Sequence, residues 1–322
     1  MIKVLITSAG CGNSVSVIKC LNKQNELPIH ITAIDMDESS AGLHLANEHL
    51  IAPSIEDESC DYIDFLISTC REREIDVLFC SADHDNAIVS ENKEEVELSG
   101  VTALCNEEDV TLRCSNKIKA IQHCVNNDIR IPKTNSGLIR ESGRVIHESI
   151  DWLPLIIKPA VGRGGKLNKI IRSEEEKRRV VLEKEFFYQE FIDGKEYSID
   201  TLSDRDGKCL AVLPRERVLV KAGESVKTKI VKDEKLIEYG KNLAELFELQ
   251  GVGCLQCIEK DGKLYFIEIN PRYGTGVTTG LGAGINMPLL NIKLFLGMEV
   301  KEEELDYKDG VIMSRYWEDI YI

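Results

Sequence analysis

The sequence predicts an α/β protein whose N-terminal part carries a parallel sheet and whose C-terminal part is α+β with an antiparallel sheet. Strand-like apolar runs alternate with helical patterns over residues 1 to about 105, as in a parallel sheet that helices cover on both faces. Much later, Asp261-Gly262 separates two apolar runs, which is a hairpin signal. At 322 residues the chain exceeds one typical domain, so we expect two or three compact units.

Composition narrows the class of protein. Hydrophobic residues make up 43% and charged residues 30%, which is ordinary for a globular protein. The net charge of −15 argues against a nucleic-acid surface, which would be basic. No apolar stretch reaches the ~18 residues that a bilayer-spanning helix needs. Eleven cysteines without a framework favour a reducing compartment. We therefore expect a cytoplasmic protein with no nucleic-acid and no membrane partner.

The N-terminal part alternates strands and helices. We expect strands at Lys3–Ser8, Ile29–Asp35, Val77–Cys80 and Thr102–Leu104, and helices at Ser14–Lys23, Ser40–Glu48, Tyr62–Glu74 and Glu91–Ser99. Ligands of such sheets bind at the carboxyl ends of the strands. Gly10, Gly12, Asp35, Asp83 and Asp85 lie at those ends. The dinucleotide fingerprint is broken because Val15 stands at its third glycine. A plain turn, an NAD site and the edge of a non-nucleotide substrate site remain as alternatives.

Two lysines follow in the middle of the chain. A connector over 106–130 carries a helix with Lys117 in its first turn, where a cation opposes the helix dipole. A strand over 154–158 ends in Lys158, and glycines 162, 164 and 165 follow with two more cations. Glycines let backbone N–H groups approach phosphate oxygens, and such a loop can close as a lid. It is not a Walker loop, because Leu167 replaces the Ser/Thr. An ordinary surface lysine and a glycine loop without a ligand are the alternatives.

The next stretch offers weaker signals. A strand at Lys169–Arg172 and a charged helix at Glu174–Lys184 precede an extended segment, the turn Asp193-Gly194 and an alternating strand. The backbone N–H and C=O groups of such a segment can pair with the edge of an adenine. The Glu196 carboxylate can accept hydrogen bonds from ribose hydroxyls. The strand over 210–220 carries Arg215 and Arg217, and Lys227 follows; a surface with these cations suits an anionic ligand. An ordinary strand and solvated charges are the alternatives. A helix at 237–249 precedes the hairpin, and the glycine-rich run 274–284 is interpreted as a substrate loop.

The hairpin carries the most informative pattern. Glu268, Asn270 and Arg272 are each two residues apart, so on a strand they share one face. Carboxylate and amide oxygens suit Mg²⁺, and an arginine can fork onto a phosphoryl oxygen. Gln256 is a candidate third ligand. A two-residue loop alone would place it on the face opposite Glu268, so the site requires an odd loop or a bulge. A half-exposed hairpin with a polar face is the alternative.

Taken together, these segments resemble the ATP-grasp superfamily. The resemblance rests on Lys117, on Lys158 with its glycine loop, on Gln189-Glu190-Phe191-Ile192 with Glu196, and on Gln256 followed by Glu268-Ile269-Asn270-Pro271-Arg272. It covers nearly the whole chain and is strongest to stand-alone proteins similar to half of a carbamoyl-phosphate synthase large subunit. It implies a Rossmann-like domain over 1–105, a connector and small α+β lid over 106–188, and a larger α+β subdomain with the metal site over 189–322.

The resemblance also implies roles for individual residues. Lys117 and Lys158 would hold the α- and β-phosphates of ATP, and the loop with Gly162, Gly164 and Gly165 would cover the triphosphate. Glu190, Phe191 and Ile192 would meet adenine, and Glu196 the ribose. Gln256, Glu268 and Asn270 would coordinate Mg²⁺, with Mn²⁺ as an alternative. Arg272 would steady the transferring phosphoryl group. Arg215 and Lys227, which the strand pattern offers to an anionic ligand, are the further catalytic candidates.

The activity implied is that of an ATP-dependent carboxylate–amine ligase. Such an enzyme activates a small carboxylate as an acylphosphate, and an amine, ammonia or an amino acid then displaces phosphate to give an amide or peptide bond. Asn116 stands where the family often has an acid, and the sequence shows no glutaminase segment and no second ATP-grasp copy, so carbamoyl phosphate synthesis by this chain alone is not expected. The alternatives are an NAD-dependent dehydrogenase using the N-terminal sheet and a non-catalytic nucleotide-binding regulator. A homodimer is compatible with the resemblance.

Overall fold

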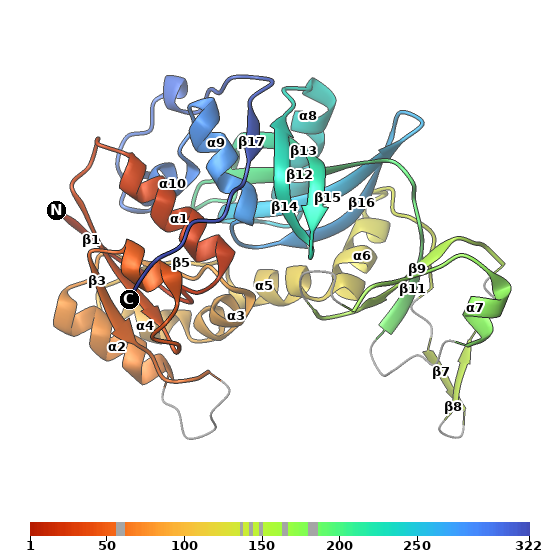
Figure 1. Ribbon diagram of the computed structural model, residues 1–322, viewed down its shortest axis with the longest axis horizontal. Helices are drawn as coiled ribbons and strands as arrows, with labels where there is room; N and C mark the ends of the chain where they lie inside the picture. The colour runs from red at the N-terminus through yellow and green to blue at the C-terminus, as the bar shows by residue number, and fades with distance from the viewer. Residues whose placement is uncertain (56–61, 136–137, 142–143, 148–150, 163–166, 180–185) are drawn as a thin grey trace.

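The computed structural model describes residues 1–55, 62–135, 138–141, 144–147, 151–162, 167–179 and 186–322 (Figure 1). In this part of the chain the strands form a five-stranded, a four-stranded and a six-stranded sheet, and a two-stranded hairpin of β7 (Leu138–Glu141) and β8 (Arg144–His147). None of the helices described is both long and apolar enough to span a membrane. The predicted α/β class, with its parallel N-terminal and antiparallel C-terminal sheets, is confirmed.

The N-terminal sheet is parallel throughout, in the order β3-β2-β1-β4-β5. Its strands are β1 (Ile2–Ile6), β2 (Ile29–Asp35), β3 (Glu48–Ile51), β4 (Val77–Phe79) and β5 (Thr102–Leu104). Side chains alternate across it: Val4 and Ile6 pack towards α1 (Gly12–Lys23), whereas Leu5 packs towards α2 (Tyr62–Arg73). Because both faces are covered, the central strands are continuous apolar runs.

In this part and the connector after it, one predicted helix was wrong and two helices were not predicted. Residues 40–48 form a 3₁₀ turn, η1 (Ala41–Leu45), and then the edge strand β3, whose half-exposed residues give only a weak pattern. The helix predicted at Glu91–Ser99 is the shorter α4 (Lys93–Glu97), and α3 (Asp83–Glu91) precedes it. Asp83 and Asp85 open α3, where acids favour a helix start. The connector holds two helices, α5 (Glu108–Ser115) and α6 (Lys117–Asn126).

The four-stranded sheet lies at the far end of the molecule from the N-terminal sheet (Figure 1). Its order is β10-β9-β11-β6, from β6 (Thr134–Asn135), β9 (Leu155–Pro159), β10 (Lys169–Ile171) and β11 (Phe186–Glu190), all paired antiparallel. Its small core consists of Leu155, Ile157, Ile171 and Tyr188. The helix predicted at Glu174–Lys184 is α7 (Glu174–Arg178), and residues 180–185 lie outside those described.

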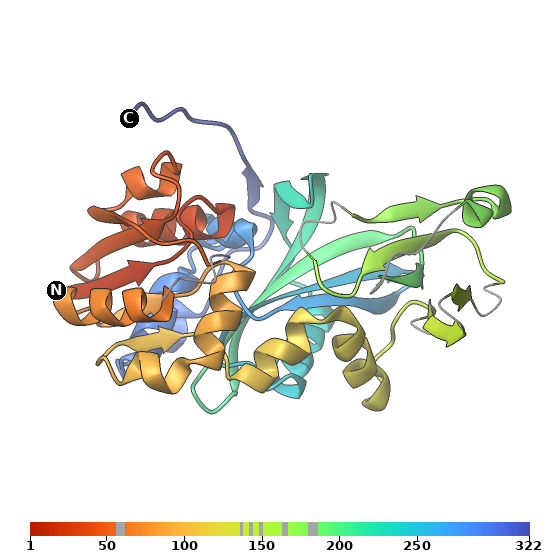
Figure 2. The same ribbon diagram turned by 90° about the horizontal axis from the view of Figure 1, so that it is seen from below.

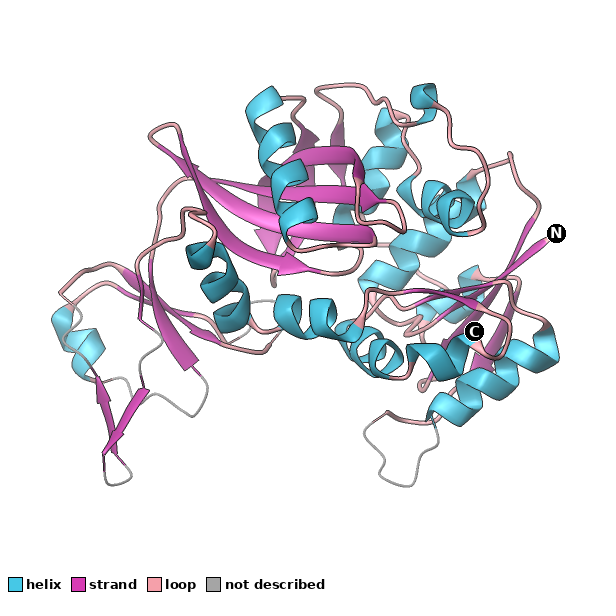
Figure 3. Ribbon diagram, turned by 180° about the vertical axis from the view of Figure 1, so that it is seen from behind, coloured by secondary structure: helices cyan, strands magenta, loops and turns pink. Residues whose placement is uncertain are grey.

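The six-stranded sheet positions most of the predicted site. Its order is β16-β15-β12-β13-β14-β17. The strands are β12 (Lys195–Ser203), β13 (Cys209–Lys221), β14 (Glu224–Ile230), β15 (Gly251–Lys260), β16 (Lys263–Asn270) and β17 (Ile312–Ser314). One face is apolar and packs against α5, α6 and α8 (Glu234–Leu246), and Figure 3 shows helices along that face. The other face carries Gln256, Glu268 and Asn270, and we name it the site face.

The C-terminal elements join the large sheet to the N-terminal one (Figure 2). The run 274–284, expected to be a loop, contains η2 (Thr275–Val277) and α9 (Thr278–Ala283). With α10 (Met287–Phe295), these elements pack on α1, and a single core cluster contains residues from all of them and from the N-terminal sheet. A short turn, η3 (Glu302–Glu304), follows. The three sheets occupy separate stretches of the chain, but because of this shared core the division 1–105, 106–188 and 189–322 stays a prediction.

Candidate functional site

The β15–β16 hairpin contains the bulge that the sequence required. Asp261 and Gly262 both have positive φ, and Lys260 pairs with Lys263, so the loop has two residues. Cys257 pairs with Phe266 but Gln256 pairs with Glu268, which leaves Ile267 as the extra residue of a bulge. The expectation that Gln256 and Glu268 lie side by side is therefore confirmed.

The bulge places the three candidate metal ligands on the site face. Phe266 and Ile269 are both in the core beneath the sheet, so the alternation shifts by one residue between them. Glu268 and Asn270 consequently point the other way, together with Gln256. The amide Nδ2 of Asn270 donates to the Cys254 carbonyl at 3.3 Å and lies 3.5 Å from Oε1 of Glu268.

This donor set fits a hard divalent cation that keeps ligands from a nucleotide. One carboxylate and two amide oxygens are the types that Mg²⁺ accepts alongside phosphate oxygens and water. Among the residues that the structure describes, no group of three or more His, Cys, Asp or Glu could hold a metal. A cation at Glu268 would therefore depend on the two amide oxygens and on ligand oxygens.

Lys117 extends from the start of α6 towards the same carboxylate. Asn116 caps the helix, accepting from the N–H groups of Ile118 and Lys119. The Lys117 ammonium lies 3.8 Å from Oε2 of Glu268 and donates to the carbonyl of Gly162 at 2.9 Å. The backbone N–H of Lys117 also bonds to Ala160 just after β9. The helix start is thereby tied to the beginning of the glycine loop, of which Gly164 and Gly165 lie outside the described residues.

Lys158 is buried at the end of β9, with 7% of its surface exposed. Its ammonium donates to Oε1 of Gln189 at 2.8 Å, and Gln189 in turn donates to Thr134 at 3.1 Å. The pKa of Lys158 is lowered to about 8, chiefly by burial and also by the nearby Lys117, and the carboxylates of Glu268 and Glu196 partly offset these two effects. A buried cation with a weakened hold on its proton is stabilised when an anion arrives.

The segment predicted to meet adenine runs from β11 towards β12. The N–H of Glu190 is bonded to the Lys133 carbonyl at 2.7 Å, and that of Phe191 to the Pro154 carbonyl at 3.0 Å. Ile192 is buried, and within the described chain its N–H has no backbone partner. Of these three residues, Ile192 thus retains the donor that an adenine edge would need.

Glu196, expected at the ribose, lies on the site face of β12. Its carboxylate is partly exposed and lies 3.0 Å from Nε of Arg217, a residue that also donates to Ser198 at 3.2 Å. Glu196 also contributes to the electrostatic environment of Lys158. The site face therefore continues from Glu268 across β15 to the start of β12.

Arg272 contacts a candidate metal ligand on β16 and a residue at the start of α3. Its Nη2 donates to Oδ1 of Asn270 at 3.2 Å. Its Nε and Nη2 also donate to the carboxylate of Asp83, at 2.6 and 3.1 Å. The guanidinium is therefore placed next to a candidate metal ligand by a residue almost two hundred positions earlier in the chain.

The other two predicted catalytic cations have different surroundings. Arg215 is fully buried and forms a two-point ion pair with Asp200, at 2.5 and 2.8 Å. The loop after Arg272 covers it, because a Cβ on Gly276 would lie 2.1 Å from its Nη1. Lys227 is exposed and precedes Thr228, the partner of Arg217, so alternation places it on the opposite face.

Several functional contacts were not assigned from sequence. Gln189, which binds Lys158, was part of the motif without a role. Asp83 was noted only as an acid at a strand end, and that position was the signal that could have identified it. Asp200 gave no signal, because its importance arises from a partner on the neighbouring strand.

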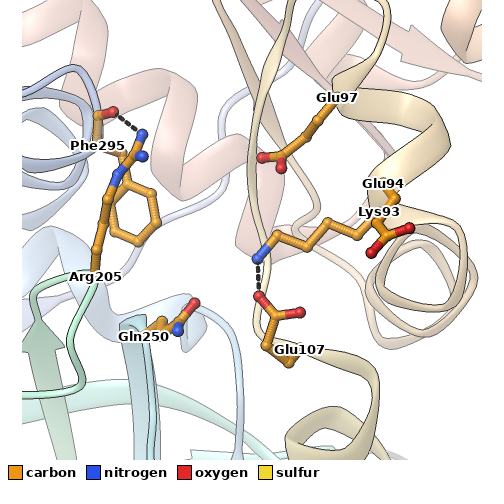
Figure 4. Close-up of a pocket in the computed structure, with 7 residues that line it drawn as sticks. All are labelled: Lys93, Glu94, Glu97, Glu107, Arg205, Gln250 and Phe295. Atoms are coloured by element: carbon orange, nitrogen blue, oxygen red, sulfur yellow. Dashed lines mark hydrogen bonds and ion pairs between the residues drawn. The ribbon is translucent and has the colours of Figure 1, made fainter.

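A separate cavity of about 350 Å³ lies between α4 and the C-terminal part (Figure 4). Lys93, Glu94, Glu97, Glu107, Arg205, Gln250 and Phe295 line it. Lys93 is ion-paired to Glu107 at 2.5 Å, and Arg205 stacks over the Phe295 ring. None of the predicted site residues lines this cavity.

Two family models match separate parts of the chain. Residues 183–317 match the family model "ATP-grasp in the biosynthetic pathway with Ter operon", and residues 4–104 match the PylC-like N-terminal domain. The carbamoyl phosphate synthase large chain of Thermoanaerobacter sp. (strain X514) is 27% identical over 203 residues, covering 57% of this chain and 18% of that one. The chain thus spans about a fifth of the length of this curated relative.

Solved structures share the fold. Biotin carboxylase of Campylobacter jejuni, in complex with β,γ-ATP, superposes with a TM-score of 0.68 at 16% identity, over 95% of this chain and 74% of that one. The L-amino acid ligase of Bacillus licheniformis gives a TM-score of 0.67 at 18% identity, over 94% and 76%. The comparisons give no support to the dehydrogenase alternative. Residues 183–317 are therefore of the ATP-grasp type, and residues 4–104 are of the PylC-like N-terminal type.

Proposed function

We propose that the protein is an ATP-dependent ligase that joins a small carboxylate to an amine. The observation that carries the proposal is the convergence of Lys117 and Lys158 on Glu268, which itself lies beside Gln256 and Asn270. Two cations facing a carboxylate and two amides form an arrangement for a metal-bound polyphosphate. Phosphoryl transfer requires mainly positioning and charge neutralisation, and these residues supply both.

In this proposal each side chain binds or orients a part of ATP or its metal ion. Lys117 and Lys158 bind phosphate oxygens of ATP, and Ile192 and Glu196 hold adenine and ribose. Gln256, Glu268 and Asn270 would hold Mg²⁺, which when bound neutralises charge on the phosphates. Arg272 faces the terminal phosphoryl group beside Asn270.

The chemistry has two balanced steps. A carboxylate oxygen attacks the terminal phosphorus, and the bond to the bridging oxygen breaks, giving an acylphosphate and ADP. The amine nitrogen then attacks the acyl carbon; the carbon–oxygen bond to phosphate breaks, and the nitrogen loses a proton. The names of the structural neighbours support this class, since they include a biotin carboxylase bound to β,γ-ATP and an L-amino acid ligase.

Thermal unfolding with Mg²⁺ plus ADP, Mg²⁺ plus a non-hydrolysable ATP analogue, and NAD in separate samples tests the proposal. A ligand at a hundred times its Kd stabilises the folded state by about 2.7 kcal/mol, which shifts the midpoint measurably. A shift with Mg²⁺-nucleotide, followed by ADP release that requires both a carboxylate and an amine, is the expected result. A shift with NAD alone would overturn the proposal.

Nucleotide binding without ADP release, over broad panels of carboxylates and amines, would instead favour a non-catalytic nucleotide-binding regulator. We also propose Mg²⁺ rather than Mn²⁺ as the working cation, which titration of activity with each metal distinguishes. A homodimer is a further expectation, and light scattering of the full chain measures it directly.

A further inference from the structure

The carboxylate of Asp83, a residue in the N-terminal part of the chain, forms an ion pair with the guanidinium of Arg272. Asp83 opens α3 immediately beyond β4. Its two oxygens lie 2.6 Å from Nε and 3.1 Å from Nη2 of Arg272, and paired bonds of this kind set orientation as well as position. The two side chains are 26% and 14% exposed, so the pair differs from the solvent-exposed ion pairs that contribute little.

The backbone of the same junction is anchored by other residues. The carbonyl of Pro271 accepts from the side-chain amides of Asn86 at 2.7 Å and Asn106 at 3.3 Å. Asn106 also accepts from the backbone N–H of Gln250 at 2.7 Å. The path of the chain after β16 is therefore held by residues other than Asp83, and the Asp83 carboxylate bears on the orientation of the Arg272 side chain.

The hydrogen bonds of Arg272 show what this orientation achieves. A guanidinium has five N–H groups. Two of them bond to Asp83, one to the carbonyl of Tyr273 at 3.0 Å, and one to Oδ1 of Asn270 at 3.2 Å. Within the described part of the chain, one N–H on Nη1 is left for a ligand. Asp83 thus places a cation with one available donor against a candidate metal ligand.

We propose that Asp83 is a positioning residue that aims Arg272 at the terminal phosphoryl group of ATP. This inference rests on the proposed function. It assigns the orientation of one catalytic side chain to a residue from the N-terminal part of the chain. Without the Asp83 carboxylate, the long Arg272 side chain can adopt other rotamers, and the contact to the terminal phosphoryl group weakens. Contacts to the α- and β-phosphates, which Lys117 and Lys158 make, do not involve Asp83.

The test compares two nucleotides by calorimetric titration of the full chain in Mg²⁺. AMPPNP carries the terminal phosphoryl group and ADP does not. We expect Asp83→Asn to raise the Kd for AMPPNP about fivefold or more, the scale of one net hydrogen bond, while the Kd for ADP changes less than about twofold. Asp83→Glu, which keeps the charge, should restore part of the AMPPNP affinity.

A double-mutant cycle separates positioning from a general effect on the fold. Arg272→Ala should reproduce the selective loss, and adding Asp83→Asn to it should cause no further loss. Glu248→Gln is the matched control, because Glu248 pairs with Arg113 at 2.9 Å well outside the site face. Should Asp83→Asn not fold, Arg272→Lys tests the same prediction, because it keeps the charge but loses the forked geometry.

The outcomes are distinct. An equal loss for both nucleotides, or unchanged affinity for both, would overturn the positioning role while leaving the ligase proposal in place. Tighter AMPPNP binding by Asp83→Asn would also overturn it, since Asp83 would then compete with the phosphoryl group for Arg272. If the wild-type protein bound neither nucleotide, the proposed function itself would fall, and this role with it.

Discussion

Replacing Lys158 by methionine should stabilise the free protein at neutral pH while it weakens nucleotide binding. Methionine has a similar length and no charge, so the substitution removes the buried ammonium but keeps most of its packing. In the free protein the ammonium is 7% exposed and bonds to the Gln189 carbonyl oxygen. An exposed structural lysine would behave differently, because its removal would leave both stability and binding nearly unchanged.

The magnitude follows from the pKa. Burial lowers the pKa of Lys158 from 10.5 to about 8, and one pKa unit corresponds to about 1.4 kcal/mol, so charging it at pH 7 costs the folded state about 3 kcal/mol. Lys158→Met recovers this cost but leaves Oε1 of Gln189 without its donor, which loses about 1–2 kcal/mol. The net expectation is a gain of about 1–2 kcal/mol in the free energy of unfolding at pH 7.

The pH dependence has a defined sign. Between pH 8 and 10.5 the unfolded chain holds a proton on Lys158 that the folded chain has released, so the wild-type stability rises with pH over that window. The advantage of Lys158→Met should therefore shrink as the pH is raised through 8 towards 10. Urea unfolding at several pH values measures this, with Lys119→Met, on the exposed side of α6, as the control.

Nucleotide affinity should move in the opposite direction. Loss of a charge-assisted hydrogen bond weakens Mg²⁺-ADP binding by about 1.5 kcal/mol or more, roughly tenfold in Kd. Because phosphate favours the protonated lysine, wild-type affinity should also fall above pH 8, and the variant should lack this slope. A variant that is less stable at pH 7, or that keeps the wild-type affinity and slope, would refute the reasoning.

Three further predictions follow from the site and its supports. Glu268→Ala or Asn270→Ala should abolish ADP release without lowering the unfolding midpoint appreciably, and full activity in either would remove the metal assignment. Gly276→Ala should destabilise by about 1–3 kcal/mol in urea unfolding, because its Cβ would meet the buried Arg215 guanidinium at 2.1 Å; a neutral result would contradict that close contact. Burial raises the pKa of Asp85, so Asp85→Asn should stabilise the protein at pH 7, with the gain fading as pH falls towards the ordinary range of an aspartate; a gain independent of pH would argue against this cause.

The turn of the hairpin and the shared face of its polar side chains could be predicted from the sequence, because both depend on neighbouring residues in the chain. Asp261-Gly262 specifies a two-residue turn through its backbone preferences. The spacing of Glu268 and Asn270 specifies one face, since side chains on a strand alternate. The requirement that Gln256 share that face left either an odd loop or a bulge, and the structure has a bulge at Ile267. The weak pattern of β3 and the division of the connector into α5 and α6 did not follow, because edge strands and short helices carry little periodic signal.

Contacts between segments that are distant in the chain could not be predicted from the sequence. Asp83 meets Arg272 only because the start of α3 lies beside the residues that follow β16. Arg215 and Lys227 looked alike as strand cations, yet one is enclosed with Asp200 beneath the Gly274–Gly276 loop and the other points away from the site face. Burial and pairing of a charge depend on what packs over it, and that is a property of the whole fold.

The sequence by itself determined the α/β class, the order of most elements, and which oxygen-bearing side chains share one face of the hairpin, because these depend on periodicity and turn chemistry within short stretches. The tertiary structure alone decided which cations face Glu268, which are enclosed, and that a carboxylate at the start of α3 pairs with Arg272. The physical reason is that hydrogen bonds and ion pairs act over a few ångströms in space, whereas the residues that form them lie up to 189 positions apart in the chain.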